Sequence, residues 1–147
     1  MNGPNAVDIL LVEDNANDAE LTLRALRKRK LANQLFVVED GAEALDFMFC
    51  RGKYIQREIA QPPKVVLLDI KLPKVNGLEV LRAIKADKQM HTIPVVMVTS
   101  SREDPDIQAA YELGANSYVV KPVDFETFAE AMSSVGLYWL LVNQAPK

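Results

Sequence analysis

Cysteine, long apolar runs and net charge are all scarce in this 147-residue sequence, and each shortage excludes a class of protein. Cys50 is the only cysteine, so no internal disulfide can form, which fits a reducing compartment. No apolar run approaches the roughly 20 residues that span a bilayer, and residues 1–7 lack the basic and apolar regions of a secretory signal. A formal charge of −3 gives no overall electrostatic attraction to nucleic acid. We therefore expect a cytoplasmic protein without a membrane or nucleic-acid partner.

Five short apolar runs, nearly continuous and rich in β-branched residues, predict strands that are covered on both faces. These runs are Ile9–Val12, Leu35–Val38, Val65–Leu68, Val95–Val98 and Tyr118–Val120. Helix-start signals lie between these apolar runs and after the last one. An Asn or Asp followed three residues later by an acid is typical of a capping pair at the start of a helix. These signals are Asn15 with Asp18, Asp40 with Glu43, Asn76 with Glu79, then Asp104-Pro105 and Asp124. The alternation predicts an α/β fold, a flavodoxin-like (βα)5 doubly wound sheet of five parallel strands in the order 2-1-3-4-5.

The length of the chain and the absence of linkers predict a single domain over residues 1–147. Its last helix is expected to continue in an extension at about 136–147. One connection, residues 52–63, is longer than the roughly two to six residues typical of such loops. It is either a surface insertion or a lid or partner-binding loop beside the site.

Polar residues that can bind a metal or a phosphoryl group follow four of the five runs. Glu13 and Asp14 follow the first run and Asp69 the third, while Thr99 and Lys121 follow the fourth and fifth. Each residue alone has an ordinary explanation, such as a helix N-terminus that favours acids, a turn, a cap or a solvated charge. Parallel strands, however, bring their carboxyl ends to one edge of the sheet, where ligands bind at the reversal of strand order. We therefore expect a functional site at this edge.

The chemistry of these residues suits phosphoryl transfer. Three carboxylates would repel one another unless a cation lies between them, and Mg²⁺ prefers such oxygen ligands together with waters and phosphate oxygens. Asp69 can be both ligand and nucleophile, because carboxylates form acyl phosphates in phosphoryl-transfer proteins. The Lys121 ammonium and the Thr99 hydroxyl would then stabilise the phosphoryl oxygens.

The stretches that carry these residues resemble response-regulator receiver domains, the phosphoacceptor modules of two-component signalling. They read LLVEDNANDAE, VVLLDIKLPKVNGLEVL, IPVVMVTSS and GANSYVVKPVDFETF, and the resemblance covers about residues 8–135. It implies that Asp69 accepts a phosphoryl group from a phosphohistidine on a partner histidine kinase. It also implies that Asp14 binds Mg²⁺ directly, Glu13 through water, and Lys71 with its backbone carbonyl.

The same resemblance implies a conformational switch made by Thr99 and Tyr118. On phosphorylation the threonine hydroxyl moves to a phosphoryl oxygen and the aromatic ring turns into the vacated space, which is a population shift between two states. A cis peptide bond is implied between Lys121 and Pro122.

A narrower similarity is to the stand-alone regulators that serve phytochrome-type photoreceptor kinases. The segments that carry it are LTLRAL, GAEALDFMFCRGKY and GLYWLL. The similarity implies a phytochrome-type sensor histidine kinase as the partner.

The last helix predicts a further interface, because apolar residues recur along it at spacings of three and four and then surround its final turns. The seam is Phe125, Phe128, Met132, Val135, Trp139 and Val142, and the final turns add Leu137, Tyr138, Leu140 and Leu141. Either the domain itself or a second copy covers this surface. We expect no DNA-binding or enzymatic output domain after it, so output would use a surface of this domain. We therefore favour a homodimer through Phe128, Tyr138, Trp139 and Leu141.

Two other functions compete with a signalling switch. A phosphohydrolase with an aspartyl-phosphate intermediate carries a second aspartate two residues past the nucleophile, where this sequence has Lys71. We therefore predict no enzyme activity beyond the protein's own phosphoryl transfer and autodephosphorylation. A pseudo-receiver that binds partners without phosphorylation stays open, although every expected site residue is present.

Overall fold

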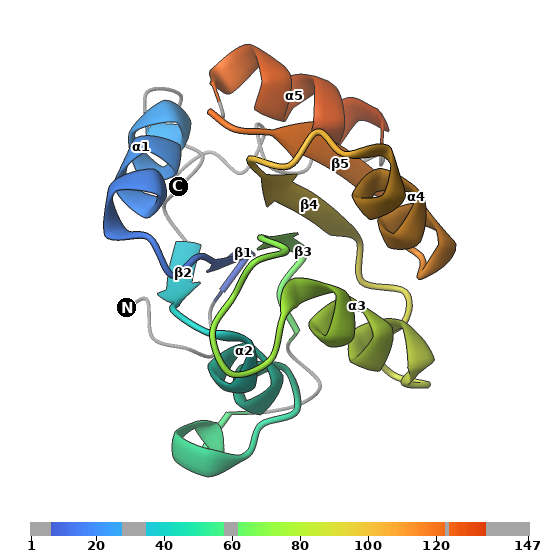
Figure 1. Ribbon diagram of the computed structural model, residues 1–147. Helices are drawn as coiled ribbons and strands as arrows, with labels where there is room; N and C mark the ends of the chain where they lie inside the picture. Colours follow the sequence, from blue (N-terminus) through green and yellow to red (C-terminus); the bar gives the residue numbers. More distant parts are fainter. Residues whose placement is uncertain (1–6, 28–34, 58–61, 123, 135–147) are drawn as a thin grey trace.

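Strands and helices alternate along the chain, as the apolar pattern predicts (Figure 1). The computed structural model describes residues 7–27, 35–57, 62–122 and 124–134. The strands are β1 (Ile9–Val12), β2 (Leu35–Val38), β3 (Val65–Leu68), β4 (Val95–Thr99) and β5 (Ser117–Val120). The helices are α1 (Ala16–Arg27), α2 (Gly41–Met48), the 3-10 turn η1 (Gly52–Tyr54), α3 (Gly77–Ala86), α4 (Asp104–Glu112) and α5 (Phe125–Ser134). All five predicted strands are confirmed, with β4 one residue longer at its end and β5 one residue longer at its start.

The five strands form one parallel sheet in the order β2-β1-β3-β4-β5, which confirms the predicted order. β1 pairs with β2 on one side and with β3 on the other, so the strand order reverses at β1. Backbone hydrogen bonds continue just past both strands. The Glu13 N–H donates to the Val38 carbonyl at 3.0 Å, and the Asp69 N–H donates to the Val12 carbonyl at 3.2 Å. The sheet therefore fixes the backbone of both acids.

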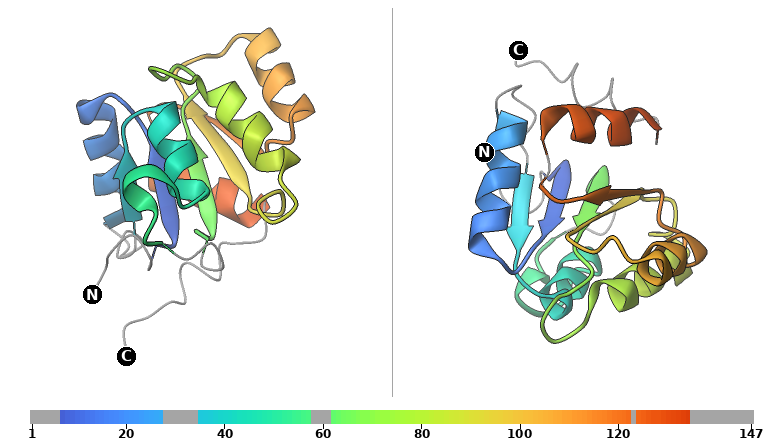
Figure 2. Two further views of the ribbon diagram at one scale, coloured as in Figure 1. Left: turned by 90° about the horizontal axis from the view of Figure 1, so that it is seen from below. Right: turned by 45° about the horizontal axis from the view of Figure 1, so that its top comes forward.

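Helices cover both faces of the sheet, with α1 and α5 on one face and α2, α3 and α4 on the other (Figures 1 and 2). Because successive strand residues point to opposite faces, each face has its own core. Leu11 of β1 and Leu26 of α1 belong to one core, whereas Leu10 and Phe47 of α2 belong to the other. Burial on both faces explains why β1 and β3 have no polar residues.

The helices begin where the capping pairs predict. The Asn15 Oδ1 accepts a hydrogen bond from the Asp18 N–H at 2.9 Å, just ahead of α1. Asp40, Asn76 and Asp124 cap α2, α3 and α5 in the same way. Each cap satisfies an N–H that would otherwise lack an intrahelical partner. Within the described ranges, no helix has both the length and the apolar character needed to cross a membrane.

The beginning of the long 52–63 connection is part of the core around α2. Tyr54 and Arg57 are both buried. The Tyr54 hydroxyl donates to the Glu43 carboxylate at 2.5 Å, and the Arg57 guanidinium lies 3.8 Å from the centroid of the Phe47 ring. Burial alone would raise the pKa of Glu43, but this hydrogen bond and the nearby Lys53 hold that pKa below its ordinary value. The segment up to Arg57 is therefore packed onto α2, whereas residues 58–61 lie outside the described residues.

Gly77 is the close-approach point between α3 and the backbone at the end of β3. Its N–H donates to the Ile70 carbonyl at 2.7 Å. A Cβ at this position would lie 1.9 Å from the Asp69 carbonyl oxygen and 2.8 Å from the Ile70 Cα. Both atoms belong to backbone that the sheet holds in place, so a side chain here cannot be accommodated by a rotamer change.

Gly77→Ala is expected to lower the free energy of unfolding by about 1–3 kcal/mol, the usual cost of forcing extra atoms into a packed site. Urea unfolding of the variant beside the wild type measures this change. Replacing an unstrained helical glycine by alanine normally stabilises a helix by up to about 1 kcal/mol. A more stable variant would therefore contradict the close approach.

Candidate functional site

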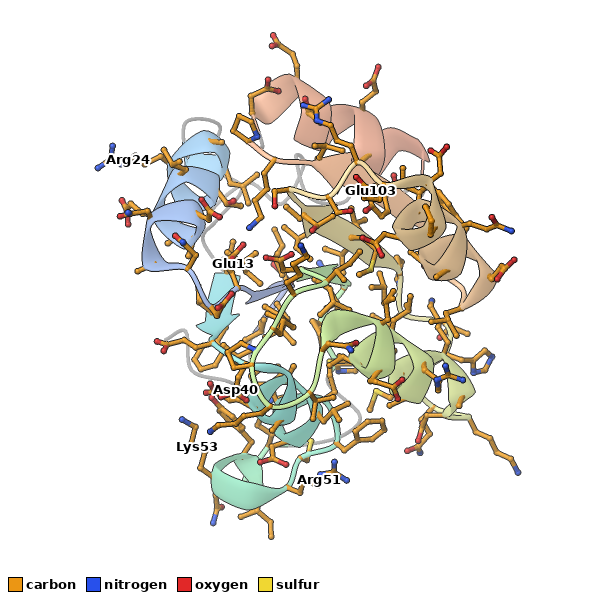
Figure 3. All side chains as sticks on the ribbon, viewed as in Figure 1. Glu13, Arg24, Asp40, Arg51, Lys53 and Glu103 are labelled. Atoms are coloured by element: carbon orange, nitrogen blue, oxygen red, sulfur yellow. The ribbon has the colours of Figure 1, made fainter. Side chains whose placement is uncertain are left out.

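Lys121 is the centre of the charged cluster at the carboxyl edge of the sheet. Its ammonium lies 2.7 Å from the Glu13 Oε1, 2.8 Å from the Asp18 Oδ2 and 2.9 Å from the Asp69 Oδ2. Glu13 stands at the end of β1, beside α1 (Figure 3). Burial alone would lower the pKa of Lys121, but its hydrogen bonds to these three carboxylates raise that pKa well above the ordinary value. The ammonium is therefore charged throughout the physiological range.

Three carboxylates gather close enough to share a metal ion. Glu13, Asp14 and Asp69 each offer one oxygen, and these oxygens all lie within 4.8 Å of one another. Glu13 and Asp69 are buried while Asp14 is exposed. Burial, together with the neighbouring Asp69 charge, raises the pKa of Glu13, although its hydrogen bond with Lys121 acts in the opposite direction. An all-oxygen donor set that is open on one side suits Mg²⁺, which keeps several waters or phosphate oxygens.

The Asp69 carboxylate is held in a single orientation. One oxygen accepts from the Ile70 N–H at 2.7 Å and the other from Lys121 at 2.9 Å. The backbone N–H of Asp69 is hydrogen-bonded to the β1 backbone, and Gly77 lies against the backbone carbonyl of Asp69. A carboxylate fixed in this way would lose little freedom if it reacted as a nucleophile.

Thr99 and Tyr118 meet through the loop that follows β4. Thr99 is 1% exposed, and its Oγ1 accepts from the Ser101 N–H at 3.3 Å. The half-buried Tyr118 donates its hydroxyl proton to the Ser101 carbonyl at 3.1 Å. The Ser101 hydroxyl in turn donates to the Asp106 carboxylate at 2.6 Å, which ties the loop to α4. Ser101 therefore links the two residues of the predicted switch pair, a role that we did not predict for it.

The predicted site residues form three groups: the acidic cluster with Lys121, the switch pair Thr99 and Tyr118 described above, and the dimer surface. Glu13, Asp14, Asp69 and Lys121 come together, and Lys71 lies in the β3–α3 loop with an exposed side chain. The Lys121–Pro122 peptide bond is cis, as predicted. The third group is the predicted dimer surface, of which the side chain of Phe128 and the whole of Tyr138, Trp139 and Leu141 lie outside the described residues.

Asp18 is a site residue that sequence reasoning missed. We predicted it only as the capping partner of Asn15, and its N–H does make that bond. Its carboxylate, however, reaches Lys121, 103 positions away in the sequence. A signal for this role was available in the sequence. Asp18 is an acid in the first turn of the helix that follows Glu13 and Asp14, and the first turn of that helix lies near the carboxyl edge of the sheet.

Residues 9–133 match the response regulator receiver domain family, and the chain belongs to this family of two-component signalling proteins. Its fold and sequence are similar to those of phytochrome-associated members. The bacteriophytochrome response regulator RtBRR is 52% identical with a TM-score of 0.83, over 94% of this chain and 82% of that one. AtBRR, of the same type, is 54% identical with a TM-score of 0.81, over 89% and 93% of the two chains.

A third relative is the response regulator Rcp1 from Synechocystis sp., which is 35% identical over 90% of this chain and 88% of its own length. A solved structure of Rcp1 is the Mn²⁺-bound form, with 32% identity and a TM-score of 0.73 over 94% of this chain and 96% of that one. The chain therefore matches these regulators over nearly their full lengths.

Proposed function

We propose that this protein is a phosphorylation-driven response regulator in which Asp69 accepts a phosphoryl group from a phosphohistidine on a sensor histidine kinase. The observation that carries the proposal is the Lys121 ammonium, which lies 2.9 Å from the Asp69 carboxylate at the edge of a three-carboxylate cluster. An Asp69 oxygen forms the new bond to phosphorus while the bond between phosphorus and the histidine nitrogen breaks. The electron pair of the broken bond stays on that nitrogen, and because the other ring nitrogen of the phosphohistidine carries a proton, the ring leaves as neutral imidazole.

Lys121 and Thr99 would stabilise the phosphoryl group after transfer. The ammonium can donate to a phosphoryl oxygen without a large movement, because it already lies against the acceptor carboxylate. Thr99 is the last residue of β4, the strand next to β3, and it is buried. Charged and hydroxyl donors aimed at phosphoryl oxygens are the usual source of catalysis in phosphoryl transfer.

Glu13, Asp14 and Asp69 would hold a Mg²⁺ ion, with the Lys71 carbonyl as a further ligand. The support is the clustered oxygen donor set and the Mn²⁺-bound form of Rcp1. When bound, the ion neutralises charge on the phosphoryl oxygens.

The partner we propose is a phytochrome-type histidine kinase, and the support is the likeness to RtBRR and AtBRR. We also propose that the protein acts in the cytoplasm as a single receiver domain and a homodimer, using the apolar surface of its last helix. The support for the dimer is the sequence pattern of that helix alone.

Intact-mass spectrometry after incubation with a small phosphodonor and Mg²⁺ tests the proposed function. We expect one phosphoryl adduct, which disappears when EDTA replaces Mg²⁺. Light scattering on the same samples reports the oligomeric state and shows whether the adduct changes it. Absence of an adduct with both the small donor and a phosphorylated phytochrome kinase would support a pseudo-receiver instead.

Thr99→Ala is expected to accept the phosphoryl group, within about tenfold of the wild-type rate, but to transmit it poorly to the β4–α4 loop. The reason is that Thr99 is bound to Ser101, which is also the partner of Tyr118. The measurement is the NMR shift of the Ser101 amide and the Tyr118 ring on phosphorylation. Thr99→Ser, which keeps the hydroxyl, is the control and should respond like the wild type. An unchanged response in Thr99→Ala would remove Thr99 from the switch.

A further inference from the structure

The Asp18 carboxylate is the outermost of the three partners of Lys121. Its side chain is 35% exposed, compared with 3% for Glu13 and 8% for Asp69. Asp18 belongs to the first turn of α1, whereas the other two acids follow strands. It is also outside the group of carboxylates that can share a metal ion. Its contact with Lys121 therefore needs a role other than metal binding.

An ammonium has three donors, and Lys121 uses all three on carboxylates. A lysine side chain has four rotatable bonds, so one contact alone does not fix where its charge lies. Two contacts to groups on different elements, Glu13 at the end of β1 and Asp18 on α1, hold the nitrogen from two sides. The third donor is then directed at Asp69, where the phosphoryl group would form.

We propose that Asp18 is a positioning residue for Lys121: with Glu13 it anchors the ammonium so that the remaining donor points at the acceptor carboxylate and later at the phosphoryl group. The inference rests on the proposed phosphorylation of Asp69. Asp18 and Lys121 both border a solvent-open crevice of about 220 Å³, whose remaining lining is Leu21, Thr22, Ser100 and Pro122. The anchored pair is thus at the surface of the molecule next to the reacting carboxylate.

The test is the rate of adduct formation at saturating Mg²⁺ and a fixed concentration of acetyl phosphate, followed by intact mass. Asp18→Ala should slow this rate by about tenfold, because small displacements of a positioned group cost one to two orders of magnitude. The matched control is Glu20→Ala, which removes an acid from the same helix. Among the described residues, the Glu20 carboxylate is paired with the exposed Arg24 and not with the site. The control should react like the wild type, and Asp18→Glu, which keeps the carboxylate, should recover most of the lost rate.

The route through Lys121 is tested by a double-mutant cycle. In a Lys121→Met background, Asp18→Ala should cause no further loss of rate, since no ammonium is left to position. A rate for Asp18→Ala equal to that of Glu20→Ala would overturn the proposal. A faster rate for Asp18→Ala would also overturn the proposal, because the Asp18 charge would then only repel the anionic donor. An equal loss of rate in the wild-type and Lys121→Met backgrounds would overturn it as well. Failure of the wild type to form an adduct with acetyl phosphate and also with a phosphorylated phytochrome kinase would overturn the proposed function as well, so the two failures are distinguishable.

Discussion

The Asp69→Asn variant is expected to form no phosphoryl adduct with either a small phosphodonor or a phosphorylated kinase. An amide is not a nucleophile at neutral pH, and loss of a nucleophile costs on the order of 10³-fold or more in rate. The fold should survive, because asparagine has the same shape and its oxygen can still accept from the Ile70 N–H or from Lys121. Intact mass, with peptide mapping of any modified residue, measures the loss.

Asp104→Asn is the matched control for Asp69→Asn. Asp104 is an exposed acid at the start of α4, so the same chemical change is made away from the carboxyl-edge cluster. This control should be phosphorylated at the wild-type rate. Urea unfolding should show both variants folded. An adduct that persists in Asp69→Asn and maps to another residue would refute the assignment of the acceptor.

The sheet and the central acids were predictable because their signals are local. Each strand is a continuous apolar run, and Asp69 and Lys121 directly follow such runs, so strand assignment alone placed them at one edge. The caps were predictable for the same reason, since Asn15 bonds an N–H only three residues away. Local pattern and final structure agree at these positions.

The parts that sequence did not predict depend on which helix face meets which neighbour. Asp18 contacts Lys121 because the first turn of α1 and the end of β5 both lie at the carboxyl edge of the sheet. Arg57 lies in the 52–63 connection, for which the sequence predicted no packing, yet it is buried and its guanidinium lies against the Phe47 ring. Lys85 is comparable, since its ammonium donates to the carbonyls of His91 and Ile93 in the turn before β4. Polar residues buried by tertiary packing leave no periodic signal in the sequence.

Lys121→Met is expected to give the second large effect, a loss of about 3 kcal/mol in the free energy of unfolding at neutral pH without metal. Removing one partner of a buried ion pair typically costs about 3–5 kcal/mol, and the lower end applies because Asp18 is partly exposed. The variant leaves three carboxylates facing one another without a cation. Urea unfolding measures the loss. The matched control is Lys88→Met, which makes the same change of charge and side chain at an exposed lysine.

Two conditions should restore stability to Lys121→Met. Addition of Mg²⁺ supplies positive charge to Glu13, Asp14 and Asp69, so the deficit relative to wild type should shrink as the ion binds. Acidification should act in the same direction. Burial and the Asp69 charge already raise the pKa of Glu13 in the wild type, and loss of the ammonium raises it further. A carboxyl group whose pKa is higher in the folded than in the unfolded state binds more protons when folded, so stability rises as pH falls through that range.

The comparison with Lys88→Met decides what Lys121 does before phosphorylation. If both variants unfold at the same urea concentration with and without Mg²⁺, then Lys121 does not neutralise the acid cluster in the resting protein. If only Lys121→Met is destabilised and Mg²⁺ recovers it, the ammonium and the metal share one electrostatic task, the neutralisation of the cluster. The proposed phosphorylation of Asp69 would add negative charge at the same place, and both cations would then be needed to balance it.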